Sequence, residues 1–312
     1  MPPADDAPQT RALPRLSRLS RLFNRLFQRS GGRSWRLSLG ACVGLALAGC
    51  DLPRTGSEPA SRAAASTVVL PPIKVFAPRR SQAPLRANAE IARDFLDLHF
   101  QLEGGSTLPS FSRFDSPITL RVTGQPAPSF NRDLNALLSR LRQEAGIAIR
   151  QVPARQAATI TIESVSRDEI RRALPKAACF VVPNVQSLAE YRRNRRSPRT
   201  NWSQLRRREQ MAIFIPNDVS PQEVRDCLHE ELAQAIGPLN DLYRLPDSIF
   251  NDDNIHAVLT GFDMLILRMT YAPELRTGMT RAEVAAQLPA ILSRLNPAGA
   301  RMAQNWLDET PR

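Results

Sequence analysis

Residues 220–240 read SPQEVRDCLHEELAQAIGPLN, and this stretch carries the start and stop signals of a single helix. Ser220 can accept a hydrogen bond from the backbone N–H three residues later, and Glu223 completes a capping box. Pro221 suits the first helical position, where no N–H is needed. A Gly-Pro pair closes the pattern, because glycine often ends helices and proline cannot continue them. The stretch therefore predicts a capped helix that stops at Gly237.

The predicted helix has one apolar face, because about 100° per residue brings residues three and four apart together. The members of this stripe are Val224, Leu228 and Ala235, flanked by Leu232 and Cys227. Glu231 falls inside the stripe, where a carboxylate is costly unless it is paired, hydrogen-bonded or bound to a metal. Two interpretations stay open at this point: Glu231 is a structural buried acid, or it is a functional group.

Polar residues border the apolar stripe. Glu230 and Gln234 are four positions apart and therefore adjacent on the helix surface, along one edge of the stripe. His229 is predicted to project to the opposite, polar side together with Arg225 and Ala233. The groups expected near the core face are thus the Glu231 carboxylate, a second carboxylate and an amide.

The string from Glu230 to Asn240, EELAQAIGPLN, resembles the metzincin zinc motif HExxHxxGxxH with its metal ligands replaced. In this resemblance Glu231 stands at the general-base glutamate, and Gly237 at the glycine that ends the helix. Glu230, Gln234 and Asn240 stand where the three histidines would be. The resemblance implies a peptidase-like scaffold with degenerate metal-ligand positions, in which Glu231 is the candidate catalytic residue.

These degenerate positions bear on the cofactor. Zinc at a catalytic site prefers imidazole or thiolate ligands, with at most one or two carboxylates. A set of Glu, Gln and Asn offers hard oxygen donors, which suit calcium or magnesium better if more oxygens join them. Asp241, Asp252 and Asp253 are the candidates for those oxygens. We therefore expect no cofactor, with a divalent metal of unknown identity as the alternative.

Several segments also resemble an uncharacterised proteobacterial lipoprotein family, domain of unknown function 2927. These segments are CLHEELAQAIGPLND (227–241), SIFND (248–252), the tyrosine at 271 and LRTGM (275–279). This resemblance covers about residues 87–290. In addition, LTGFDMLILRMTY (259–271) is similar to the helix that follows the site in secreted metzincins.

The resemblances imply an α+β, zincin-like (metzincin-related) domain with a short mixed sheet, a central site helix and a C-terminal helical part. The hydrophobic periodicity predicts helices at 90–102 and 132–145 and from Thr280 to about Leu295, and strands at 118–122, 147–152, 159–165, 178–182 and 211–215. The last of these strands is expected at an edge of the sheet, leading into the site helix. The arginine-rich segment 190–208 is expected to be an exposed loop.

The first fifty residues have the layout of an export signal. Residues 1–36 contain eight arginines and two acids, and an apolar run, LSLGACVGLALAG, follows at 37–49. This run is too short to cross a bilayer as a helix. It ends at Cys50 in a sequence that resembles the lipobox of bacterial lipoproteins, in which the cysteine is acylated. The expected organisation is therefore a signal peptide (1–49), a lipidated cysteine with a Pro/Ala/Ser-rich tether (50–86) and a zincin-like domain (87–312).

This organisation decides the compartment and the partners. Acyl chains on Cys50 hold the protein in a bilayer, facing the periplasm. Asp51 resembles an inner-membrane retention signal, and the outer membrane is the alternative. The formal net charge is +12, but a leader with eight arginines and two acids accounts for about half of it. Export argues against nucleic acid as the partner, despite the basic composition. The expected partners are the lipid bilayer and a peptide or cell-envelope protein.

Two cysteines remain in the mature domain, since Cys42 leaves with the leader and Cys50 is acylated. In an oxidising compartment Cys179 and Cys227 are expected to form a disulfide, which would clamp a strand to the site helix. The competing interpretation is a pair of unpaired buried thiols.

Three functions fit the sequence. The first is a non-catalytic binding or structural module of the cell envelope, built on a degenerate metzincin-like scaffold. The second is an active, peptidase-like hydrolase that uses Glu231 as general base with an atypical oxygen-ligand metal site. The third is a purely structural lipoprotein in which Glu230, Glu231 and Gln234 form a buried polar network. A cleft beside the site helix would separate the first from the third.

Overall fold

The computed structural model describes residues 85–251 and 256–300. The predicted leader, Cys50, Asp51 and nearly all of the predicted tether lie outside these residues. Asp252 and Asp253, two of the candidate oxygen donors, also lie outside them. Every helix and strand given below falls within the range predicted for the domain.

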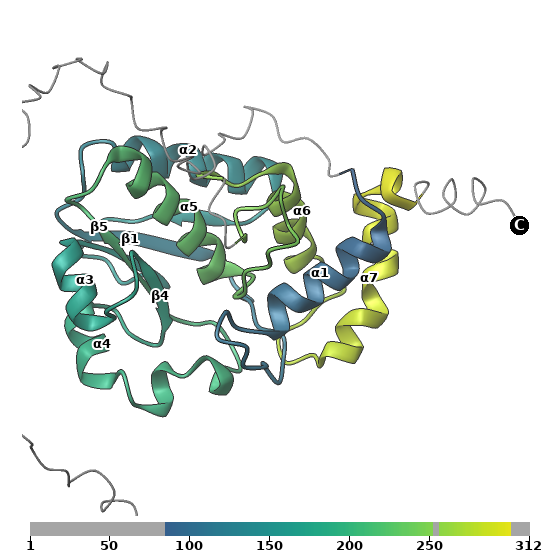
Figure 1. Cartoon of the computed structure of the whole chain (residues 1–312), viewed down its shortest axis with the longest axis horizontal. Helices are drawn as coiled ribbons and strands as arrows, with labels where there is room; N and C mark the ends of the chain where they lie inside the picture. Colours follow the sequence, from purple (N-terminus) through teal and green to yellow (C-terminus); the bar gives the residue numbers. More distant parts are fainter. Residues whose placement is uncertain (1–84, 252–255, 301–312) are drawn as a thin grey trace, which may run out of the picture. The chain divides into compact units, whose positions relative to one another are not determined.

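A five-stranded mixed sheet forms the framework of the domain (Figure 1). Its strands in chain order are β1 (Ile118–Gly124), β2 (Ile149–Gln151), β3 (Ile160–Val165), β4 (Phe180–Pro183) and β5 (Met211–Pro216). Their spatial order is β2-β1-β3-β5-β4. Only β4 is antiparallel to its neighbour, while the other pairs are parallel. The prediction of an α+β domain with a short mixed sheet is confirmed.

The prediction that residues 211–215 form an edge strand is wrong. β5 pairs with β3 on one side, where Ile213 lies opposite Ile162, and with β4 on the other. All six residues of β5 are buried, as expected of a strand whose two faces are both covered. The edge strand on this side of the sheet is β4, and β2 forms the opposite edge. Which strand ends the sheet depends on pairing between distant segments, which the pattern within one strand does not encode.

Helices cover both faces of the sheet. Alternate side chains of β5 enter two apolar clusters: Ile213 and Ile215 join one, and Ala212 and Phe214 join the other. The first cluster includes residues of α2 (Phe130–Glu144) and α5 (Pro221–Ile236), and the second includes residues of α3 (Arg167–Ala173) and α4 (Leu188–Asn194). The helix α5 packs directly against β4 and β5.

Residues 190–208 are largely exposed, as their arginine content predicts, but they are not an irregular loop. The segment starts within α4 and continues through two short 3₁₀ turns, Pro198–Thr200 and Trp202–Gln204. It ends at Arg208, whose side chain is only 3% exposed. The composition does not indicate this one exception, because a buried arginine and a solvated one look alike in sequence.

The remaining helices are α1 (Asn88–Phe100), α6 (Gly261–Thr270) and α7 (Arg281–Leu295). The last two form the C-terminal helical part that the sequence predicts. α1 lies beside α7, so the two ends of the described chain are brought together (Figure 1). None of the helices in the described ranges combines the length and apolar character needed to cross a membrane.

Candidate functional site

The start and the position of α5 follow from local signals in its sequence. The Ser220 side chain accepts a hydrogen bond from the Glu223 N–H, and the Glu223 carboxylate accepts one from the Ser220 N–H at 3.0 Å. The predicted disulfide between Cys179 and Cys227 is present, with the two Cα atoms 5.9 Å apart. It joins the helix to the segment immediately before β4, so this edge of the sheet is held covalently against α5.

The side of α5 opposite its apolar stripe is also buried, which corrects the prediction for His229. The Nδ1 atom of His229 accepts a hydrogen bond from the backbone N–H of Leu259 at 3.2 Å. Ala233, on the same side, is fully buried. Burial, followed by the charges of Arg140 and Arg225, lowers the pKa of His229 to about 3. The helical-wheel prediction for His229 failed because α2 and the chain before α6 pack against this side of α5. The sequence of α5 alone does not show that other elements pack there.

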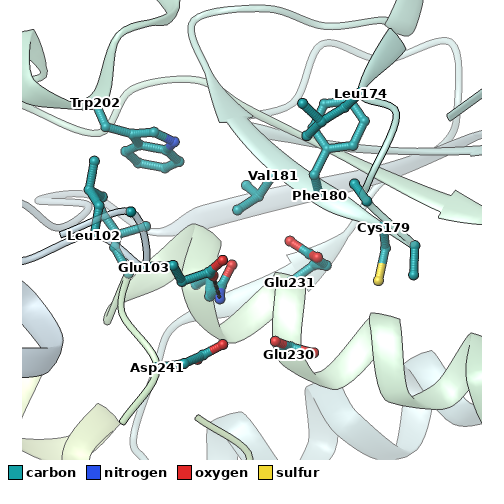
Figure 2. Close-up of a pocket in the computed structure, with 15 residues that line it drawn as sticks. Leu102, Glu103, Leu174, Cys179, Phe180, Val181, Trp202, Glu230, Glu231 and Asp241 are labelled. Atoms are coloured by element: carbon teal, nitrogen blue, oxygen red, sulfur yellow. Dashed lines mark hydrogen bonds between the residues drawn. The ribbon is translucent and has the colours of Figure 1, made fainter. Parts of the chain in front are cut away.

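A pocket of about 450 Å³ lies beside α5 (Figure 2). Its walls come from the loop after α1 at residues 102–104, from residues 174–181 leading into β4, and from Trp202. The helix itself contributes Glu230, Glu231 and Gln234. The site helix therefore borders a cavity that is formed in part by the edge strand of the sheet.

Acidic side chains dominate the ionisable groups of this pocket. Four carboxylates line it, from Glu103, Glu230, Glu231 and Asp241, and Figure 2 shows these side chains around the same space. Among the described residues, no lysine, arginine or histidine lines the pocket. Charges of one sign in a partly enclosed space reinforce one another, because the protein walls focus the field.

Glu231 is the carboxyl group most affected by this setting. It is 5% exposed, and its Oε2 has no hydrogen-bond partner among the described residues. Burial, and then the charges of Glu230, Glu103 and Asp241, raise the pKa of Glu231 well above its ordinary value of 4.5. A carboxyl group in such a place keeps its proton to a higher pH than an exposed one, which suits a general acid or base.

The predicted metal-ligand positions do not all face the pocket. Glu230 and Gln234 line it, and the Gln234 amide donates a hydrogen bond to the Glu103 carboxylate at 3.2 Å. Asn240 is instead turned toward α1, where its amide donates to the carbonyl oxygen of Asp97 at 3.2 Å. Its neighbour Asp241 lines the pocket in its place.

The residues of this site do not fit zinc. The positions hold carboxylates and an amide rather than the imidazole or thiolate groups that zinc prefers. His229, the histidine nearest in sequence, instead accepts a hydrogen bond from the Leu259 N–H in the chain before α6. Within the described ranges, no group of three or more His, Cys, Asp and Glu side chains has the arrangement of a metal site.

The C-terminal end of α5 is braced by two side chains from elsewhere. The guanidinium of buried Arg208 donates to the carbonyl oxygens of Gln234 and Gly237. The Tyr271 hydroxyl donates to the Ile236 carbonyl oxygen at 3.0 Å. These bonds satisfy carbonyls that the end of a helix leaves without intrahelical partners.

Sequence reasoning placed neither Glu103 nor Trp202 beside the site helix. Glu103 lies in a polar loop with no local sign of function, more than a hundred positions before Glu231. Trp202 lies in an arginine-rich segment, where an aromatic residue among charges is the only signal. Each is brought to the site by the fold, through the loop after α1 and the turn before β5.

The fold and the site define an α+β domain in which a buried glutamate of a helix faces an acidic pocket beside a sheet edge. The chain belongs to the family described as a protein of unknown function, DUF2927, whose model matches residues 88–290. No curated protein and no solved structure matches the chain.

Proposed function

We propose that this protein is a lipid-anchored lipoprotein facing the periplasm, and that its domain binds an extended peptide or a segment of an envelope protein without zinc-dependent catalysis. The observation that carries this proposal is the pocket of about 450 Å³ between α5 and β4. A purely structural network around Glu231 would leave no such space, whereas a binding module needs one. The volume is within the range typical of ligand sites.

The edge position of β4 supports a mode of binding. β4 is paired on one side only, and its four residues are buried, so an incoming extended segment can add to the sheet there through main-chain hydrogen bonds once it displaces the chain that covers this edge. Phe180 and Val181 of β4 also line the pocket. A peptide running along β4 would therefore place one of its side chains in the pocket.

The zincin-like scaffold is part of this proposal. β5 leads into the motif helix α5 through residues 217–220, an antiparallel strand ends the sheet beside that helix, and α6 follows. This order supports the resemblance that the motif in residues 230–240 suggests. The replaced ligand positions then favour a scaffold kept for binding over an active zinc peptidase, since fold alone does not fix activity.

The binding function is tested by filling the pocket. A Cβ added at Gly104, which lines the pocket, would meet no atom within 4 Å, so Gly104→Trp should occupy the pocket and leave the core intact. The matched control is Ala89→Trp, at an exposed position of α1. Peptides selected from a random library on the full chain in nonionic detergent should lose at least about tenfold in affinity with Gly104→Trp alone. Equal affinity for both variants would refute binding in this pocket.

The anchor is tested separately, because it depends on residues 37–50. Cells grown with an alkyne-tagged fatty acid should label the wild-type protein and a Cys42→Ser variant. Cys50→Ser should abolish the label and leave the uncleaved precursor. Label that persists in Cys50→Ser would refute the lipoprotein assignment.

A second candidate function is hydrolysis with Glu231 as general base. The unpartnered, buried oxygen of Glu231 and its raised pKa are the observations in its favour. Cleavage of a quenched fluorescent peptide library by the full chain, lost in Glu231→Gln and kept in the exposed-site control Glu90→Gln, would support it. Absence of cleavage under conditions in which peptides bind would exclude hydrolysis and leave binding as the function of the pocket.

A further inference from the structure

The pocket combines negative charge with apolar walls. Its four carboxylates belong to Glu103, Glu230, Glu231 and Asp241, in a chain whose formal net charge is +12. Leu102, Val181 and Trp202 supply apolar surface around them. A ligand that suits both features has a positively charged end and an apolar stem.

A buried group independently indicates a ligand of this kind. Glu231 is only 5% exposed, lines the pocket and has an Oε2 atom with no hydrogen-bond partner in the described part of the chain. Figure 2 shows this side chain directed from α5 into the space between β4 and the loop after α1. A buried oxygen that lacks a donor is costly, and a donor brought by a ligand removes that cost.

The arrangement favours an organic cation over a metal ion. A divalent metal needs several oxygens converging within about 2.0–2.6 Å of one point. No group of three or more acidic, histidine or cysteine side chains in the described residues has that arrangement. The carboxylates instead lie around a pocket of about 450 Å³, in which a cation with several N–H donors can reach more than one of them.

We infer that the pocket receives a single cationic side chain of a bound peptide, an arginine guanidinium or a lysine ammonium, whose N–H groups donate to Glu231 and its neighbouring carboxylates. This inference rests on the proposed peptide-binding function and names the side chain that the pocket selects. The methylene stem of the cation packs on Trp202 and Val181. The peptide backbone continues along β4.

The probe is a set of three short alanine peptides, blocked at both ends, with arginine, lysine or citrulline at the centre. Citrulline has nearly the shape of arginine but no charge, so the comparison isolates the cation. Titration calorimetry on the full chain in nonionic detergent should show the arginine peptide binding at least about tenfold more tightly than the citrulline peptide. Glu231→Gln should bring this ratio toward one, while Glu90→Gln, on an exposed part of α1, should keep it.

A second measurement does not depend on the stability of any variant. Burial, and then the charges of Glu230, Glu103 and Asp241, raise the pKa of Glu231, whereas a bound cation stabilises its ionised form. Binding of the arginine peptide should therefore release protons at any pH at which Glu231 is protonated in the free protein. The observed heat of binding should therefore differ between phosphate and Tris buffers, because each released proton adds the ionisation heat of the buffer that takes it up. The difference between buffers should be smaller for the citrulline peptide.

The outcomes separate this inference from the proposed function. Equal binding of the arginine and citrulline peptides would refute the cation and leave the peptide-binding function standing. Binding of none of the three peptides would also refute the inference that a cationic side chain occupies the pocket. The peptide-binding function is then decided separately, by the library selection with Gly104→Trp. A charge preference that survives Glu231→Gln would place the cation elsewhere and overturn the site proposed for it.

Discussion

The guanidinium of Arg208 donates a hydrogen bond to the carbonyl oxygen of Gln234 at 2.6 Å, in the last turn of the helix that carries the site. A second bond from Arg208 reaches the carbonyl oxygen of Gly237. Burial lowers the pKa of Arg208 to about 10, so the side chain stays charged at neutral pH. The residue therefore places a buried positive charge at the carbonyl end of α5, where the helix dipole favours it.

Replacement of Arg208 should destabilise the domain. Arg208→Met removes the donors to both carbonyl oxygens but keeps an apolar stem of similar length. We expect a loss of about 2–4 kcal/mol in the free energy of unfolding, because hydrogen bonds to a charged group contribute about 1.5–3 kcal/mol each and do not add fully. The matched control is Arg207→Met at the neighbouring position, which is 62% exposed and forms a surface ion pair with Asp115. Urea unfolding should show a change of no more than about 0.5 kcal/mol for that control.

Glu231→Gln should stabilise the domain at neutral pH. The folded-state pKa of Glu231 is raised, so wild-type stability falls as pH rises from the ordinary value of 4.5 toward the folded-state pKa. A neutral glutamine lacks this dependence. In urea melts at pH 7, the free energy of unfolding of the variant should exceed that of the wild type by about 1–3 kcal/mol. This is the penalty typical of an unsatisfied buried polar group. The difference should disappear below pH 4.5, where the wild-type carboxyl is protonated in both states. A variant less stable than the wild type at pH 7 would show that the charge itself supports the fold.

Some of this site could be predicted from the sequence because the signals are local. The capping box at Ser220 and the Gly-Pro stop fix both ends of α5, and the position of Glu231 in the apolar stripe indicates its burial. The disulfide followed from counting the cysteines that remain when the predicted leader and Cys50 are set aside. Each of these inferences needs only residues near one another in the chain, or the chemistry of a compartment.

The rest of the site depends on long-range packing. Arg208 and Trp202 lie in a segment whose arginines predict solvent, and only contacts with α5 distinguish the buried arginine from its exposed neighbours. His229 was assigned to a polar face because a helical wheel contains no information on the other elements that cover a helix. Glu103 enters the pocket through the packing of α1, for which the motif in α5 offers no hint.

The disulfide should stabilise both the domain and the pocket wall. It closes a loop with a sequence separation of 48 residues, for which a loop-closure model gives about 4 kcal/mol. The double variant Cys179→Ser, Cys227→Ser should therefore unfold at lower urea concentration, with a loss of about 2–4 kcal/mol. Dithiothreitol should destabilise the wild type and leave the double variant unchanged. Equal response of both proteins to the reductant would mean that the bond does not constrain the fold.

Acid should destabilise the domain through His229. The pKa of His229 is lowered from an ordinary value of 6.5 to about 3 in the folded state, so the unfolded chain binds the proton more readily. Stability from this residue is fully present above pH 6.5 and is lost as pH falls toward 3, at up to about 1.4 kcal/mol per pH unit. His229→Asn can keep an acceptor for the Leu259 N–H without this titration. Between pH 6 and 4, urea melts should show a shallower decline in the free energy of unfolding for this variant than for the wild type. The two slopes should differ by up to the value for one bound proton, about 1.4 kcal/mol per pH unit. Parallel declines would mean that His229 is protonated in the folded domain and that its hydrogen bond to Leu259 does not persist in acid.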